Sequence, residues 1–392
     1  MRLRSLTIAL VALATAAPLA HAQDAWPSQV DQIITGTLEL TGLPSIQVAI
    51  GHRGSVALSR AYGFADVENT VPATPATRYR TASVSKWFTG TAVMRLAERG
   101  ALDLDAPIQT YCPAYPEKGA PITARQLLSH TSGIRHYEDY DDLLAAATTD
   151  AERRAIETRR DRAIASSVTR YTDVVAPLAV FADDPLLYTP GRGYAYSSFG
   201  YRVLGCVLAG AAEKPYSAVL QEEVFDRVGM DATVPDDVQA LIPNRATGYD
   251  MAGLNDVRRA ALRDVSENLP AGGHLSTAED LVRFAMAFDA GNLVTEATIA
   301  VMSREPVGPN GEEIPSGYGH GVDLIGRFPG SLGHPGGQAG ASCIVVLFPE
   351  EDLVVALMSN GGGLGSGDQI VEQIVSVLRP VLDANGTLTT AP

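Results

Sequence analysis

Two pairs of short β-type segments, one near each end of the chain, constrain the fold more than any other feature of the sequence. Near the N-terminus, Ser45–Gly51 and Ser55–Tyr62 are joined by His52-Arg53-Gly54, which predicts a hairpin. Near the C-terminus, Ser342–Phe348 and Leu353–Met358 flank a Pro-Glu-Glu-Asp turn and predict a second hairpin. Because an isolated hairpin is only marginally stable, we expect the two to combine into one antiparallel sheet built from both ends of the chain.

Helical patterns accompany this sheet. An apolar period of 3.6 follows the start signal Pro27-Ser28, and another follows Gly367. From Trp87 to about Phe288 the pattern is mostly helical. The sequence therefore predicts an α/β (α+β) fold, in which a central antiparallel sheet is flanked by helices. A mostly α-helical lobe over about residues 87–288 is inserted into it, with a cleft between the two parts.

A densely charged segment over about residues 137–186 lies within this lobe. It contains Glu138–Asp142 and the basic and acidic run Ala151–Arg162. Such a pattern is typical of a solvated helical excursion. A lid over the cleft is the alternative, because loops and insertions near a cleft often carry function.

The first 22 residues predict a secretory signal peptide. Arg2 and Arg4 precede an apolar run, Leu6–Ala20, which is short for a membrane span, and Ala20-His21-Ala22 has the form of a cleavage site. An uncleaved anchor or a buried helix is the alternative. We therefore expect a single periplasmic or secreted domain over residues 23–392. No later segment is apolar and long enough to predict a membrane span.

Charge and cysteine content exclude several classes of function. Without Arg2 and Arg4, 28 basic residues stand against 45 acidic ones, and this formal charge of −17 argues against a nucleic-acid partner. Cys112, Cys206 and Cys343 cannot all pair, so a disulfide scaffold is excluded, although one bridge involving Cys112 is left open. The other two lie in apolar runs and are expected to be buried. Neither His-x-x-x-His nor Cys-x-x-Cys occurs, so we expect no metal, and no motif predicts a cofactor.

Ser83-Val84-Ser85-Lys86 is the strongest local candidate for chemistry. Side chains at positions i and i+3 of a helix share a face, so the Ser83 hydroxyl and the Lys86 amine can come within hydrogen-bond distance. The first turn of a helix also offers unpaired N–H groups at the positive end of the helix dipole. The alternative is a serine N-cap followed by a solvated lysine, so the interpretation depends on further motifs.

Two distant segments supply other groups that a serine nucleophile needs. The turn-rich segment Pro190–Tyr201 leads into an apolar helix and carries Tyr196-Ser197-Ser198. Gly333–Gly340 precedes the final hairpin and contains His334, and its glycines permit close approach of a substrate to the backbone. By itself, each of these side chains is equally typical of a structural role, and we interpret His130 as a structural loop histidine.

Taken in order, these motifs resemble those of the penicillin-recognising serine hydrolases, which comprise serine β-lactamases, D-alanyl-D-alanine peptidases and related esterases. Ser83-Val-Ser-Lys86 resembles the first motif of that family, Tyr196-Ser197-Ser198 the second and His334-Pro335-Gly336 the third. Supporting stretches are similar to the class C-like branch and, within it, to the mitochondrial serine β-lactamase-like members. These stretches are Leu127–Ile134, Ala271–Thr277 and Gly333–Gly337 for the branch, and Tyr62–Asn69, His130–Glu138 and Tyr196–Tyr201 for those members.

The resemblance implies a double-displacement acyl transfer. Ser83 would attack a carbonyl, and Lys86, its amine partly neutral, would accept or relay the serine proton. Tyr196 would pass a proton to the leaving group, and whether lysine or tyrosine is the general base is left open. Water would then release the acyl group.

The same resemblance assigns the remaining site residues. His334 would border the tyrosine and the substrate, and the N–H groups of Ser83 and Gly337 would form the oxyanion hole. Gly336 and Ser198 would complete the substrate contacts.

Two departures from the pattern bear on substrate choice. In β-lactamases of this branch the second motif usually ends in asparagine and the third begins with lysine, whereas here Ser198 and His334 occupy those places. Near neutral pH a histidine carries little of the charge with which lysine holds a β-lactam carboxylate. The sequence therefore favours a peptidase or esterase that takes a small-molecule or peptide substrate. A true β-lactamase or D-alanyl-D-alanine carboxypeptidase is one alternative, and a non-catalytic or filament-forming scaffolding protein of the same fold is another; a homo-oligomer is left open.

Overall fold

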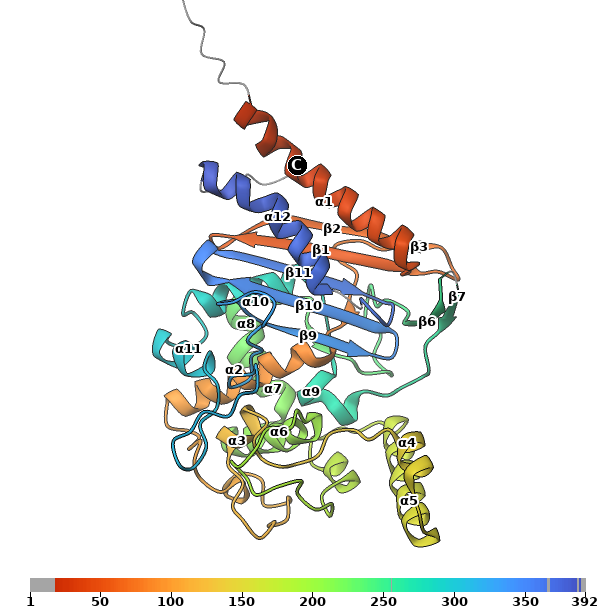
Figure 1. Ribbon diagram of the computed structural model, residues 1–392, viewed down its shortest axis with the longest axis vertical. Helices are drawn as coiled ribbons and strands as arrows, with labels where there is room; N and C mark the ends of the chain where they lie inside the picture. The colour runs from red at the N-terminus through yellow and green to blue at the C-terminus, as the bar shows by residue number, and fades with distance from the viewer. Residues whose placement is uncertain (1–17, 255, 365–366, 386–387, 389–392) are drawn as a thin grey trace, which may run out of the picture.

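The computed structural model describes residues 18–254, 256–364, 367–385 and 388, and it consists of two terminal helices, a sheet and a larger, mainly helical part (Figure 1). Most of the predicted signal peptide lies outside the described residues. The helices are α1 (Pro18–Thr41), α2 (Ser85–Glu98), α3 (Ala124–Leu128), α4 (Tyr140–Ala146), α5 (Asp150–Ser167), α6 (Ser198–Ala212), α7 (Tyr216–Leu220), α8 (Asp226–Val228), α9 (Leu269–Gly272), α10 (Ala278–Asp289), α11 (Glu296–Met302) and α12 (Gly367–Asn385). The strands are β1 (Ser45–His52), β2 (Ser55–Asp66), β3 (Val71–Pro72), β4 (Tyr79–Arg80), β5 (Val234–Pro235), β6 (Tyr249–Gly253), β7 (Asp256–Arg259), β8 (His274–Ser276), β9 (Leu332–Gln338), β10 (Ala341–Phe348) and β11 (Leu353–Ser359). Short helical turns are η1 (Ala82–Val84), η2 (Ile108–Thr110), η3 (Ala176–Val180), η4 (Gln221–Phe225), η5 (Ser266–Asn268) and η6 (Pro349–Glu351).

The predicted sheet from both chain ends is confirmed. Its strand order is β3-β2-β1-β11-β10-β9, and the neighbouring strands are antiparallel. The two hairpins meet where β1 pairs with β11, with Ile50 opposite Val355. Arg53 and Gly54 both have positive φ, at 50° and 74°, which closes the first hairpin with the turn that the sequence predicts.

Alternating side chains give the sheet two apolar faces. Val48, Val346 and Val355 belong to the core under α1 and α12, whereas Val345 belongs to the core shared with α2 and α10. Figure 1 shows the terminal helices on one face of the sheet and the helical part on the other. α12 starts at Gly367, as expected. The start expected for α1 at Pro27-Ser28 is wrong, because the helix already begins at Pro18 and includes Pro27.

Between residues 87 and 288 most of the regular secondary structure is helical, with irregular segments between the helices. Four short strands interrupt the pattern: β5 and β8 form a small sheet with β4, and β6 pairs with β7. α2 lies at the centre, and most of its side chains are buried. Among the described helices no single one is long and apolar enough to cross a membrane. The bent pair of Ser198–Ala212 and Tyr216–Val228 reaches that length and composition only when the two segments are taken together, and α6 is buried in the core.

A disulfide joins Cys112 and Cys206, 94 residues apart. The bridge that the sequence left open for Cys112 is therefore present, and Cys206 is half of it rather than only a buried apolar side chain. Cys343 is free and buried, as expected. The bridge connects the segment after η2 to α6, whose N-terminal end carries the second motif.

The charged segment 137–186 forms the hairpin of α4 and α5, which projects from the body (Figure 1). Along α5 only Ile156 and Ser166 are buried, so most of the helix is solvated, as its charge pattern indicates. Its C-terminal part reaches a cavity that Ser83 also lines, where Ile164 and Ser167 form part of the wall. The segment is thus a solvated excursion whose end also borders a cavity.

Candidate active site

Ser83 lies in η1, immediately before α2. The residue before it, Ala82, has a φ of +42°, a conformation that non-glycine residues rarely adopt, so the backbone turns sharply at this point. Thr81 holds the turn in place: its N–H donates to the His274 carbonyl at 2.9 Å, and its hydroxyl lies 2.8 Å from that of Ser85. The turn leaves Ser83 partly exposed to a cavity while its neighbours are buried.

Lys86 is fully buried beneath Ser83. Its Nζ lies 3.0 Å from Ser83 Oγ and donates to the Ala271 carbonyl at 2.9 Å. Burial, and then the positive charge of Arg202, hold the pKa of Lys86 well below its usual value. A neutral amine keeps a lone pair, so Lys86 can take the Ser83 proton while its own N–H groups anchor it to α9.

Tyr196 completes the group around the nucleophile. Its ring centroid lies 4.9 Å from Lys86 Nζ. Burial raises the pKa of Tyr196, and a hydrogen bond with Ser83 opposes that shift only in part. Near neutral pH this side chain is therefore a protonated phenol, suited to donating a proton, beside an amine that is suited to accepting one.

His334 is buried on β9, with its ring centroid 6.4 Å from that of Tyr196. Its Nδ1 lies 2.6 Å from the Pro335 carbonyl, which can only accept, so Nδ1 carries the proton and Nε2 accepts from the Tyr318 hydroxyl at 3.0 Å. Burial, and then the charge of Lys86, lower the pKa of His334 to about 3. His334 thus borders the tyrosine, as expected, and is neutral.

The two glycines of the third motif differ in their surroundings. A Cβ at Gly336 would lie 2.6 Å from the Thr81 carbonyl oxygen and 2.7 Å from Cys343 Sγ, so only glycine lets β9 pack this closely against η1. Gly337 lines the same cavity as Ser83, with nothing within 4 Å of a Cβ built there. The oxyanion hole expected from the N–H groups of Ser83 and Gly337 stays a prediction.

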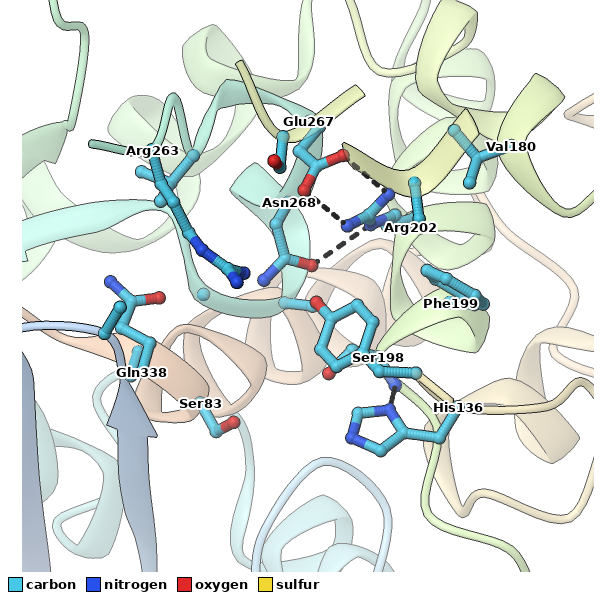
Figure 2. A pocket seen from close by; sticks show the side chains of 18 of the residues that line it. Ser83, His136, Val180, Ser198, Phe199, Arg202, Arg263, Glu267, Asn268 and Gln338 are labelled. Atoms are coloured by element: carbon cyan, nitrogen blue, oxygen red, sulfur yellow. Dashed lines mark hydrogen bonds and ion pairs between the residues drawn. The ribbon is translucent and has the colours of Figure 1, made fainter. Parts of the chain in front are cut away.

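A cavity of about 390 Å³ opens over Ser83. Ser198, at the start of α6, lies on its wall, whereas Gly336 does not. Opposite Ser83, Arg202 forms an ion pair with Glu267 at 3.2 Å (Figure 2). Within the described part of the chain no group of three or more His, Cys, Asp or Glu side chains could hold a metal ion.

The sequence as a whole matches a known family. Residues 30–378 match the family model described as Beta-lactamase. The chain belongs to the Beta-lactamase family. It is 30% identical over 388 residues to the mouse (Mus musculus) protein named "Serine beta-lactamase-like protein LACTB, mitochondrial". The alignment covers 79% of this chain and 70% of the mouse protein.

Solved structures of other proteins share the β-lactamase fold. EstCE1, described as a hydrolase with promiscuous acyltransferase activity, aligns with a TM-score of 0.73 at 23% identity, over 91% of this chain and 99% of its own. The D-amino acid amidase from Ochrobactrum anthropi SV3 aligns with a TM-score of 0.71 at 23% identity and the same coverage. An octameric penicillin-binding protein homologue from Pyrococcus abyssi gives 0.70 at 21%, over 91% of this chain and 77% of that one. At these identities the likeness shows the fold.

This β-lactamase-family chain holds its second motif with two histidines. The Ser197 N–H donates to His130 Nδ1 at 3.1 Å, and the Ser198 N–H donates to His136 Nδ1 at 3.0 Å. The His130 ring also packs against Tyr196, with centroids 4.4 Å apart. His130 therefore has the structural role that the sequence suggests.

His136 is a site residue that the motifs did not indicate. It lines the cavity beside Ser198 (Figure 2). Burial, followed by the charges of Lys86, Arg202 and other basic groups, lowers the pKa of His136 to about 4. Because Nδ1 accepts a hydrogen bond, the neutral ring carries its proton on Nε2 and offers a donor next to the position where β-lactamases of this branch have an asparagine amide.

Proposed function

We propose that this protein is a serine hydrolase that forms an acyl-enzyme on Ser83 and acts on peptide, amide or ester bonds. One observation carries the proposal: Lys86 Nζ lies 3.0 Å from Ser83 Oγ in a buried setting that lowers its pKa. Among the residues that the structure describes, no carboxylate pairs with Lys86, and a buried lysine without such a partner has little structural value because desolvating an amine costs stability. Its position is explained by a need for a base beside the serine.

The proposed reaction has two stages. Lys86 takes the proton as Ser83 Oγ attacks the carbonyl, and the N–H groups of Ser83 and Gly337 stabilise the oxyanion. Tyr196, a phenol at neutral pH, donates a proton to the leaving group, and Lys86 restores the tyrosine. Lys86, neutral again after it has reprotonated the tyrosine, takes a proton from the water that attacks the acyl-enzyme. That proton passes to Ser83 Oγ as the acyl group leaves it.

The substrate class follows from the third motif. His334 is neutral and already donates to the Pro335 carbonyl, so it cannot hold a β-lactam carboxylate as lysine does. Neighbours of the fold described as a hydrolase with promiscuous acyltransferase activity and as a D-amino acid amidase support an ester or amide substrate. A true β-lactamase or D-alanyl-D-alanine carboxypeptidase is the alternative within the same mechanism.

Covalent labelling tests this proposal. Wild type, Ser83→Ala and the control Ser55→Ala, which changes an exposed serine on the first hairpin, are incubated with a fluorophosphonate and with a fluorescent penicillin. Intact mass should show one fluorophosphonate adduct on wild type and on the control, and none on Ser83→Ala. No adduct with either probe, or an adduct on Ser83→Ala, would refute the proposal. Fast release of the penicillin adduct would instead identify a β-lactamase. A library of peptides, amides and esters then gives the substrate.

A scaffolding protein of the same fold is the second candidate, and the octameric structural neighbour is the observation that favours it. Light scattering as a function of protein concentration measures assembly. Assembly that persists undiminished in Ser83→Ala, together with failure of all acyl probes, would favour this candidate.

We further propose that the mature protein is periplasmic or secreted. The charged and apolar pattern of residues 1–22 supports export, and the Cys112–Cys206 disulfide is of a kind that persists in oxidising compartments. N-terminal sequencing of the protein recovered from cell fractions tests this. A mature chain that starts after Ala22 supports export, and an intact Met1 in the cytosol contradicts it.

A further inference from the structure

Arg263, between β7 and η5, lines the cavity over Ser83. Figure 2 shows its side chain extending from the backbone toward the space between Gln338 and Asn268. No ion pair to Arg263 is found among the residues that the structure describes. A basic side chain therefore faces the proposed active site with its charge unused.

Of the other charged side chains on this wall, all but Asp264 form ion pairs in the described part of the molecule. Glu267 pairs with Arg202 at 3.2 Å, and Arg80 pairs with Asp236 at 2.7 Å. Asp264, adjacent to Arg263 in the sequence, accepts a hydrogen bond from the Ser266 N–H. Arg263 is exposed and has no ion pair of its own among the described residues, so its guanidinium is available to an anionic group that enters the cavity.

Two amides beside Arg263 have donors to spare. Gln338 Nε2 is buried without a hydrogen-bond partner in the described part of the molecule. Asn268 Oδ1 accepts from Arg202 Nε at 3.2 Å, and in Figure 2 its Nδ2 is turned away from Arg202, toward Arg263. A buried amide donor without a partner costs free energy unless a ligand supplies the acceptor.

We infer that Arg263, Gln338 and Asn268 form a subsite for a free carboxylate of the substrate. The inference rests on the proposed function, since it assigns the substrate class of the same cavity. A planar guanidinium with neighbouring N–H donors matches the two oxygens of a carboxylate. The preferred acyl donors are then esters or amides that bear a free carboxylate, such as peptides with a free C-terminus, over their neutral counterparts.

This subsite lies apart from the place where lysine would stand in the third motif. Gln338 is four residues beyond His334 on β9, which corresponds to ~13 Å along an extended strand. The substrate carboxylate would therefore lie toward the C-terminal end of β9. Compared with a lysine in the third motif, this subsite binds the carboxylate at a different place, so a different set of carboxylate-bearing molecules fits the cavity.

Matched ester pairs test the subsite. 3-Carboxyphenyl acetate and 3-carbamoylphenyl acetate differ in the leaving group, and 4-nitrophenyl hemiglutarate and 4-nitrophenyl butyrate differ in the acyl group. In at least one pair, Arg263→Gln should lower kcat/KM for the carboxylate ester about tenfold or more and leave the neutral ester within about twofold. Arg154→Gln, which removes the same charge from the exposed side of α5, should change neither. An unchanged preference in Arg263→Gln in both pairs overturns the inference.

A binding measurement separates this inference from the proposed function. In the Ser83→Ala background, calorimetric titration with hippurate and with hippuramide reports charge recognition without turnover. Adding Arg263→Gln should weaken hippurate binding about tenfold or more and leave hippuramide unchanged. Retained hippurate selectivity with no acylation of wild type would refute the proposed function alone. Normal acylation with no hippurate selectivity would refute the subsite alone.

Discussion

Replacing Gly336 with alanine should both destabilise the protein and slow its acylation, whereas the same change at Gly337 should leave the stability unchanged. A Cβ at position 336 would lie 2.6 Å from the Thr81 carbonyl oxygen, 2.7 Å from Cys343 Sγ and 3.1 Å from the Ser83 nitrogen. The first of these contacts is to backbone, so β9 or η1 must move by several tenths of an ångström. Neither glycine has a positive φ, so backbone strain does not enter the comparison.

Overpacking of a core contact costs about 1–3 kcal/mol of unfolding free energy. Because the displaced segment carries Ser83, the rate of fluorophosphonate labelling should also fall, by about tenfold or more, since small misplacements of reacting groups have large kinetic effects. Gly336→Ala should therefore lose both stability and reactivity, whereas Gly337→Ala, with open space around its new methyl group, should keep its stability within about 0.5 kcal/mol.

Guanidinium chloride unfolding gives the stability, and labelling followed by intact mass gives the rate. Cys343→Ala in the Gly336→Ala background should restore part of the loss, because it removes one of the crowding atoms. Equal stability and equal labelling rates for Gly336→Ala and Gly337→Ala would refute the view that β9 positions the nucleophile by direct packing.

Three further predictions follow from the site and its supports. Lys86→Met should slow labelling of Ser83 by about 10²–10⁴-fold, because it removes the base, and should not lower the stability, because it also removes a buried amine. In wild type the labelling rate should rise with pH through the lowered pKa of Lys86 and then level off. A Lys86→Met variant that labels as fast as wild type would contradict this role. His334 has a folded pKa of about 3, so the unfolded chain binds more protons as the pH falls through 6.5, and stability is lost. Between pH 6.5 and 5 this one histidine removes ~1.6 kcal/mol, and His334→Gln should reduce the measured loss by that amount, whereas an identical pH slope would refute the assignment. Replacing Cys112 and Cys206 with serine opens a bridge that spans 94 residues of sequence and should cost ~2–5 kcal/mol in denaturant unfolding, and equal unfolding midpoints for the two proteins would contradict it.

The parts of the fold that the sequence predicts are those with local signals. The two hairpins have β-branched runs, alternation and tight turns, so their position and pairing could be inferred. The local pattern does not predict β9, because Leu332–Gln338 contains His-Pro-Gly-Gly, which is poor strand sequence, and only the family resemblance places His334 on a strand. It is extended because β10 pairs with it, with Val345 opposite His334, and tertiary pairing outweighs local propensity.

The site residues also divide into those that sequence motifs identify and those that only the folded structure identifies. The fold brings Ser83, Lys86, Tyr196 and His334 together, and the sequence could name them because their motifs follow one another in a recognisable order. The side chains that set substrate charge carry no such signal. Arg263 lies in an irregular segment, and only the folded arrangement places it next to Gln338, on a distant strand.

Trapping the acyl-enzyme during turnover tests the central claim most directly. Wild type and Ser83→Ala are mixed with 4-nitrophenyl acetate, quenched in acid within the first turnovers, and examined by intact mass and peptide mapping. The account predicts one acetyl group on the peptide that contains Ser83 in wild type and none at that peptide in Ser83→Ala. An ester that is turned over with no acetyl group on Ser83, or at an undiminished rate by Ser83→Ala, would contradict it.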